Sequence, residues 1–237
     1  MRLLDDGSYV IDEPIDISGE GATDFVFTRG WLLEIIMLSR GEYSFFSDGK
    51  HVRSPKNHFG VFYPPFCLVR AFAREFKGRV LGVGSEQPLE GLPASPLLFE
   101  TEFGEAFSNA REAVEVLKRS PHRQPIDVCT DPSLVSLKAK RLIDENYLIY
   151  PSISRIAKRL NISHEHMSRQ FKRDYGLSPN AYLHQLRLAD ASFRLARGEE
   201  IIDISQEVGY NDLSRFYSQF RKATHTSPAI CRKQVFK

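Results

Sequence analysis

The C-terminal half of this 237-residue chain contains an internal repeat, and the repeat constrains the fold more than any other feature. The segment IAKRLNISHEHMSRQFKRDYGLSP (156–179) aligns with ISQEVGYNDLSRFYSQFRKATHTSP (204–228), which carries one inserted residue. A repeat of this regularity predicts two copies of one supersecondary unit. The matching apolar residues are Leu160 and Val208 at an offset of 48, and Met167 and Phe216, then Phe171 and Phe220, at an offset of 49.

Each copy has the pattern of a helix-turn-helix. A short helix ends at an apolar residue, and a three-residue turn with an apolar middle residue follows it, which is Asn161-Ile162-Ser163 in the first copy and Gly209-Tyr210-Asn211 in the second. The turn ends in side chains that can cap the next helix: Ser163 in the first copy, and Asn211 or Asp212 in the second. That second helix buries two apolar residues spaced four apart.

The opposite face of this second helix carries short polar groups and cations, which suit the DNA major groove because arginine bonds guanine O6 and N7 there. A solvated charged face is the plainer alternative for such a row. The candidate DNA-binding residues are His164, Glu165, His166, Ser168, Arg169, Lys172 and Arg173 in the first copy, and Leu213, Ser214, Arg215, Tyr217, Ser218, Arg221 and Lys222 in the second.

Net charge separates the two halves of the chain. Residues 1–132 hold 14 Lys and Arg against 20 Asp and Glu, a net of −6, while residues 133–237 hold 18 against 10, a net of +8. A basic segment of about 100 residues favours a polyanionic partner. The same segment is predicted to be all helical, with helices at 133–147, 152–160, 164–175, 179–197, 201–208, 213–223 and 228–235.

Residues 133–237 resemble the DNA-binding domain of the AraC/XylS family of bacterial transcription regulators. The motifs that carry the resemblance are SRQFKRDYGLSPNAYLHQLRLADA (168–191) and ISQEVGYNDLSRFYSQFRK…SPAICR (204–232). The resemblance implies helix-turn-helix units at about 152–175 and 201–223, joined by the long helix at 179–197. It also implies that both second helices enter successive major grooves of double-stranded DNA, and that the protein contacts RNA polymerase as an activator, a repressor or both.

The second copy departs from the family pattern in several places. Ser218 stands where arginine is frequent and Leu213 where a polar residue is frequent, so we expect the first copy to dominate base readout and Arg215, Arg221 and Lys222 to contact phosphates. Three further departures are His225 in place of a turn glycine, Ser205 in place of alanine, and Cys231 in place of tyrosine.

Residues 1–119 form the predicted regulatory domain, which is β-rich and carries 11 of the 17 phenylalanines by residue 103. By analogy with the family we expect a cupin-like barrel that binds a small effector, so the whole chain is classed as α+β. A helical apolar stripe follows at 104–119 and could pack on this barrel or on a second copy in a homodimer. The proline-containing segment 120–132 is the predicted linker.

No metal or other cofactor is expected. His51 and His58 are the histidines of the β-rich part and are interpreted as turn or surface residues, while Arg53, Arg70 or Arg74 could hold an effector carboxylate. The three cysteines, Cys67, Cys129 and Cys231, show no ligand spacing and fit free thiols in a reducing cytoplasm, with a redox role for Cys67 left open. The N-terminus lacks a signal-peptide pattern, and no apolar run is long enough for a membrane span, which together favour a cytoplasmic protein.

The His164-Glu165-His166 triplet raises the question of a zinc site. Residues i and i+2 of a helix point about 200° apart, so these two imidazoles cannot chelate one ion. A cupin-type enzyme or metal-binding protein with an accessory nucleic-acid domain remains the alternative function, although no nucleophile–base pair, phosphate loop or metal triad supports it. A module that uses its helix-turn-helix units to bind proteins is a third reading, which the basic charge disfavours.

Overall fold

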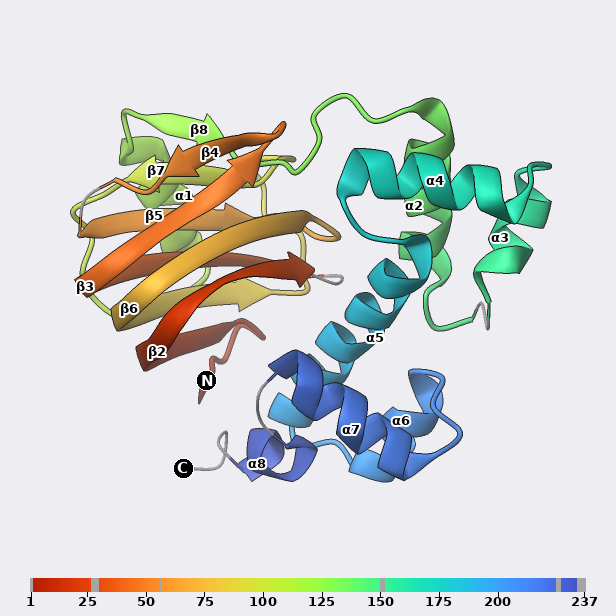
Figure 1. Cartoon of the computed structure of the whole chain (residues 1–237). Coiled ribbons are helices and arrows are strands. Elements are labelled where there is room, and N and C mark those ends of the chain that lie inside the picture. The colour runs from red at the N-terminus through yellow and green to blue at the C-terminus, as the bar shows by residue number, and fades with distance from the viewer. Residues whose placement is uncertain (1, 27–29, 56, 150–151, 225–226, 234–237) are drawn as a thin grey trace. The chain divides into compact units, whose positions relative to one another are not determined.

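The computed structural model describes all residues except 1, 27–29, 56, 150–151, 225–226 and 234–237. The chain forms two compact units, an N-terminal unit at Met1–Thr130 and a C-terminal unit at Asp131–Lys237 (Figure 1). No helix of the described part combines the length and the apolar composition needed to cross a bilayer. The three cysteines are free thiols, as predicted.

The N-terminal unit is built on one antiparallel sheet in the order β1-β2-β6-β3-β5-β7-β8, with β4 paired to β3. Three of its strands are long enough to bend, and irregular register between β3 and β6 near Arg40 marks one bend. β5 ends directly before Pro64, as expected because proline cannot donate to the ladder. The strands are β1 (Arg2–Leu3), β2 (Tyr9–Val26), β3 (Trp31–Ser47), β4 (Lys50–Arg53), β5 (His58–Tyr63), β6 (Leu68–Ser85), β7 (Leu97–Glu100) and β8 (Arg123–Pro125).

The apolar stripe after the sheet packs on its own unit. Helix α1 (Arg111–Arg119) buries Ala113, Val116 and Leu117 in one core with Leu33 and Phe62 of the sheet. Of the two packing alternatives, the structure therefore shows the intramolecular one. The predicted helix at 104–119 is too long, because Asn109 Oδ1 accepts hydrogen bonds from the amides of residues 111 and 112 and begins the helix there.

The segment predicted as a linker at 120–132 is largely part of the N-terminal unit. Strand β8 lies within it and pairs with β7, and Ile126 is fully buried. Thr130 also donates hydrogen bonds to the Asp48 carboxylate from its amide and its hydroxyl. The prolines correctly predicted irregular backbone, but the buried side chain of Ile126 packs the segment onto the N-terminal unit.

The C-terminal unit contains α2 to α8 and reproduces the seven predicted helices to within a few residues at their ends. Ser178 accepts a hydrogen bond from the Ala181 amide at the start of α5, and Gly198, at φ 86°, follows its end. The helices are α2 (Leu134–Asn146), α3 (Ile153–Arg159), α4 (His164–Tyr175), α5 (Pro179–Ala196), α6 (Ile201–Glu207), α7 (Leu213–Thr224) and α8 (Pro228–Lys233).

Helix α5 connects two small cores. Figure 1 shows α5 running from α2 and α4 to α6 and α7. Its first half carries the buried Tyr182 and contacts α2 and α4, while its second half packs Leu188, Ala191 and Leu195 against α6 and α7. A buried polar network fixes α5 to the end of α2: the Arg187 Nε atom donates to the Tyr147 carbonyl at 2.8 Å. The two helix-turn-helix copies are thus joined by one continuous helix.

Candidate DNA-binding surface

The turns of the two copies have the same backbone path. Asn161 and Gly209 follow the first helix of each copy in the left-handed region, at φ 55° and 86°. The next amide then returns to the last turn of that helix, from Ile162 to the Ala157 carbonyl at 3.1 Å and from Tyr210 to the Ser205 carbonyl at 2.8 Å. This is the helix-ending pattern that a left-handed residue permits, and it fixes the angle at which the second helix leaves.

The second helix of each copy begins at a side-chain cap. Ser163 Oγ accepts from the His166 amide at 3.1 Å, and Asp212 Oδ1 accepts from the Ser214 amide at 2.8 Å. Each cap satisfies an amide that the helix leaves free, as the sequence predicts. Of the two capping alternatives in the second copy, the structure shows the aspartate.

The buried face of each second helix is apolar, as predicted. Met167 and Phe171 of α4 and Phe216 and Phe220 of α7 are all fully buried. In the second copy the middle residue of the turn is part of this core, because the ring of Tyr210 lies 5.4 Å from that of Phe216.

The residues proposed to face DNA are accessible. His166, Ser168 and Tyr217 are half-buried. Arg173 is tied to Asp174, to which its Nε atom donates at 2.8 Å, whereas among the described residues Arg169 and Arg221 have no ion-pair partner. The remaining members are exposed: His164, Glu165, Arg169, Lys172, Arg173, Leu213, Ser214, Arg215, Ser218, Arg221 and Lys222.

The substitutions that depart from the family pattern are accommodated where the structure describes them. Ser205 is buried, and its hydroxyl donates to the Ile202 carbonyl at 2.8 Å, so the extra polar group has a partner. Cys231 packs against the core of the second copy. His225 lies outside the described residues.

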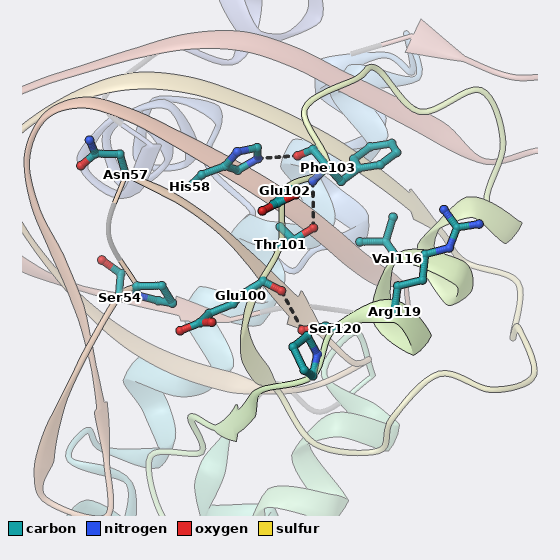
Figure 2. A pocket seen from close by; sticks show the side chains of 12 residues that line it. Ser54, Asn57, His58, Glu100, Thr101, Glu102, Phe103, Val116, Arg119 and Ser120 are labelled. Carbon is teal, nitrogen blue, oxygen red and sulfur yellow. Dashed lines mark hydrogen bonds between the residues drawn. The ribbon is translucent and has the colours of Figure 1, made fainter.

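The N-terminal unit has an open groove with a volume of about 1140 Å³ between the β4–β5 connection, the segment after β7 and the end of α1 (Figure 2). Polar and charged groups line it, including Glu100, Glu102 and Arg119, and Phe103 and Val116 add apolar surface. His58 Nε2 is hydrogen-bonded to the Phe103 carbonyl at one side of this groove, so His58 is a half-buried structural residue rather than a simple surface one. His51 is exposed on β4, with its ring 4.0 Å from that of Phe46.

The half-buried side chain of Glu34 lies on the opposite face of the sheet from Leu33, which packs in one core with α1. Burial raises the pKa of Glu34 to about 7, and a hydrogen bond with the Tyr63 side chain opposes this rise. Glu34 in turn raises the pKa values of Tyr9, Tyr43 and Tyr63, each of which is raised chiefly by burial. Among the described residues, no group of three or more His, Cys, Asp or Glu side chains could hold a metal ion.

Comparison with known proteins agrees with this geometry. A family model described as a helix-turn-helix domain matches residues 156–234. The transcriptional activator RhaS of Pectobacterium carotovorum is 33% identical over 95 residues, which are 40% of this chain and 34% of RhaS. The lactose operon transcription activator of Staphylococcus xylosus is 37% identical over 81 residues, 34% of this chain and 29% of the relative. The model that matches these residues is of the AraC/XylS type of helix-turn-helix domain.

The match to these AraC/XylS relatives spans about a third of their length. Over the whole chain, a structure of ToxT from Vibrio cholerae, described as unsaturated fatty acid bound, superposes with a TM-score of 0.54 at 13% identity and covers 100% of this chain and 97% of ToxT. At this identity the likeness concerns the fold alone.

Two features of the site are absent from the sequence prediction. His184 and Arg187 of α5 lie beside the turn of the second copy, and together with Arg215 they line a cavity of about 270 Å³. Both residues fall within an ordinary amphipathic pattern, and their neighbours from the turn and from α7, Gly209 to Arg215, lie 22 or more residues further along the chain. Such a long-range cluster leaves no local signal in the sequence.

Proposed function

We propose that this protein is a sequence-specific DNA-binding transcriptional regulator that reads two successive major grooves with α4 and α7. The observation that carries the proposal is the doubled helix-turn-helix, in which both second helices bury their apolar face and expose a row of cations and short polar groups. The relatives that share this domain are named as transcriptional activators and regulators, not as enzymes. DNA readout is therefore a better account than the alternative of a cupin-type enzyme.

In vitro selection from random double-stranded DNA tests the proposal. We expect one enriched site with two half-sites about one helical turn apart, and an affinity that falls steeply as salt rises. Equal affinity for the selected site and for random DNA would refute it. A stoichiometric metal ion in the purified protein, together with an absence of DNA binding, would instead favour the enzyme alternative.

The N-terminal unit is proposed to be a cupin-like regulatory domain. Its bent antiparallel sheet supports this, as does the fold shared with ToxT, one structure of which is described as fatty acid bound. The groove of Figure 2 is the proposed effector site, because it combines apolar surface with charged groups of both signs. Repeating the selection with and without candidate metabolites tests effector control, and labelling near Arg119 that an effector prevents would locate the site.

Two partners of the family remain proposals here. Contacts with RNA polymerase follow from the named activity of the relatives, and co-precipitation on promoter DNA tests them. A homodimer would need a surface other than the buried stripe of α1, whose remaining exposed residues are charged, as Glu115 and Lys118 are. Sedimentation of the purified protein over a range of concentrations measures its oligomeric state.

A further inference from the structure

A small basic cavity lies within the C-terminal unit, where α5 meets the turn of the second copy. The cavity, here called the α5–α7 pocket, is lined by His184 and Arg187 of α5, by Tyr210 and Asp212 of the turn, and by Arg215 in the first turn of α7. Its volume of about 270 Å³ is several times the roughly 30 Å³ that one water molecule occupies in the liquid. A phosphate group therefore fits within it.

Arg187 brings a buried positive charge to this pocket. Its side chain is 5% exposed, and its Nε atom is used in the hydrogen bond to the Tyr147 carbonyl. Its two terminal nitrogens lie at the turn, because a Cβ atom on Gly209 would stand 2.9 Å from Nη1 and 3.2 Å from Nη2. Burial lowers the pKa of Arg187, and the electrostatic effect that opposes it comes from the Tyr210 hydroxyl.

The other basic groups of the pocket are close enough to repel one another. Burial lowers the pKa of His184, and the charges of Arg187 and Arg215 lower it further. The Tyr210 hydroxyl lies 3.4 Å from His184 Nδ1. Two guanidinium groups face one carboxylate, that of Asp212, which is exposed and already accepts the Ser214 amide. The side chains that line the pocket therefore carry a net positive charge, which attracts an anion.

The position of the pocket indicates which anion would bind there. It adjoins the N-terminus of α7, a 12-residue helix whose exposed row is the proposed groove-reading row of the second copy. When a recognition helix enters the major groove by its N-terminal end, the residues just before that helix lie against the sugar-phosphate rim of the groove. Amides and the helix dipole at such an end add to the attraction for phosphate.

We infer that the α5–α7 pocket binds one phosphate of the DNA backbone, so that the connecting helix α5 takes part in DNA binding through His184 and Arg187. The inference rests on the proposed DNA-binding function and extends it to two residues, His184 and Arg187, that lie outside both helix-turn-helix copies. Arg187 also holds the end of α2, so the phosphate would bear directly on the helix that carries both copies.

Neutral-phosphate mapping tests the inference on the full chain. Each phosphate of the selected DNA site is replaced in turn by an uncharged methylphosphonate, and affinity is measured for the wild type and for the double variant His184→Ala/Arg215→Ala. For the wild type, replacement of one phosphate in the half-site read by α7 should weaken DNA binding about tenfold, as expected for the loss of a hydrogen bond to a charged group. The double variant should bind the unmodified site about tenfold more weakly and lose nothing further at that phosphate.

Controls separate this result from simpler ones. Lys222→Ala, which removes an exposed cation of α7 outside the pocket, should leave the sensitivity at the pocket phosphate intact. Thermal unfolding of each variant shows that the domain is folded. The inference is overturned if the protein binds its site specifically but every methylphosphonate weakens the wild type and the double variant to the same degree. It is also overturned if inorganic phosphate protects the pocket while this equality holds. Failure of the proposed function is a different outcome, since no DNA sequence would then be preferred at all.

Discussion

The two helix-turn-helix copies share a backbone path and a buried face but differ at several of the positions that they expose. α3 and α6 end in the same left-handed turn, and α4 and α7 bury two large side chains each. On the outer face, however, the first copy presents Arg169 where the second presents Ser218. Packing constrains the buried positions of both copies alike, whereas the exposed positions are free to adopt different roles in DNA recognition.

The strongest test of this comparison is removal of one buried ring from each copy. Phe171→Ala and Phe220→Ala each empty a fully buried site in a packed core, so each should lower the free energy of unfolding of the C-terminal unit by about 3–5 kcal/mol. Denaturant unfolding followed by circular dichroism measures both losses. A loss below about 1 kcal/mol for either variant would show that the two cores are not equivalent.

Alanine substitutions at matching exposed positions should affect DNA binding differently in the two copies. Arg169→Ala removes an exposed cation from the groove-reading row of α4 and should weaken specific binding by about 1–3 kcal/mol while relaxing the preference at one base pair. Ser218→Ala, at the matching position of α7, should change affinity by less than about 0.5 kcal/mol. Binding isotherms on the selected site and on its single-base variants measure both effects, and equal losses would contradict a dominant first copy.

The left-handed turn residues give a third contrast. Gly209→Ala places a side chain at φ 86° and against the Arg187 guanidinium, so it should cost more than about 1 kcal/mol of stability. Asn161→Gly should change stability by only a few tenths of a kcal/mol, because asparagine already tolerates its φ of 55°. Thermal unfolding of the two variants is the measurement. Tolerance of Gly209→Ala would show that the turn of the second copy can change its path.

These contrasts also show what the sequence could predict. The helices of the C-terminal unit follow from local patterns: capping serines, proline at the first helical position, and apolar residues at helical spacing. Asn161 and Gly209 are residue types that accept positive φ, in agreement with the left-handed turn that the structure shows in both copies. Their exposed rows then follow from geometry alone.

Long-range pairing explains what the sequence left undetermined. Strand β8 forms because Arg123 to Pro125 pair with β7. The proline-containing sequence around these residues has no local pattern that predicts a strand. The sequence did not decide whether the apolar stripe of α1 packs on its own sheet or on a second copy of the chain. In the structure Leu33 and Phe62 of the sheet cover it. The α5–α7 pocket likewise depends on His184 and a turn more than 20 residues away meeting in space.

The caps of the two recognition helices should contribute similar amounts. Ser163→Ala and Asp212→Ala each leave one helix amide without its side-chain partner and should cost about 1 kcal/mol of stability. Asp212→Ala differs in one respect, since it also removes the carboxylate from the α5–α7 pocket and should thereby tighten DNA binding slightly. Paired unfolding and binding measurements distinguish these effects. Weaker DNA binding by a fully folded Asp212→Ala variant would argue that the cap itself positions α7 on DNA.

The smallest expected effect is a pH dependence that only the second copy should show. Burial and the charges of Arg187 and Arg215 hold the pKa of His184 below its ordinary value of 6.5, with Tyr210 and Asp212 as the other titratable neighbours in the pocket. A bound phosphate raises that pKa, so binding takes up protons, and affinity should rise a few-fold as the pH falls from about 7 through the His184 pKa. His184→Asn should abolish this pH dependence, because asparagine does not titrate. If the wild type and His184→Asn had identical pH profiles, the histidine would not contact the anion, and the two copies would differ less in chemistry than their sequences suggest.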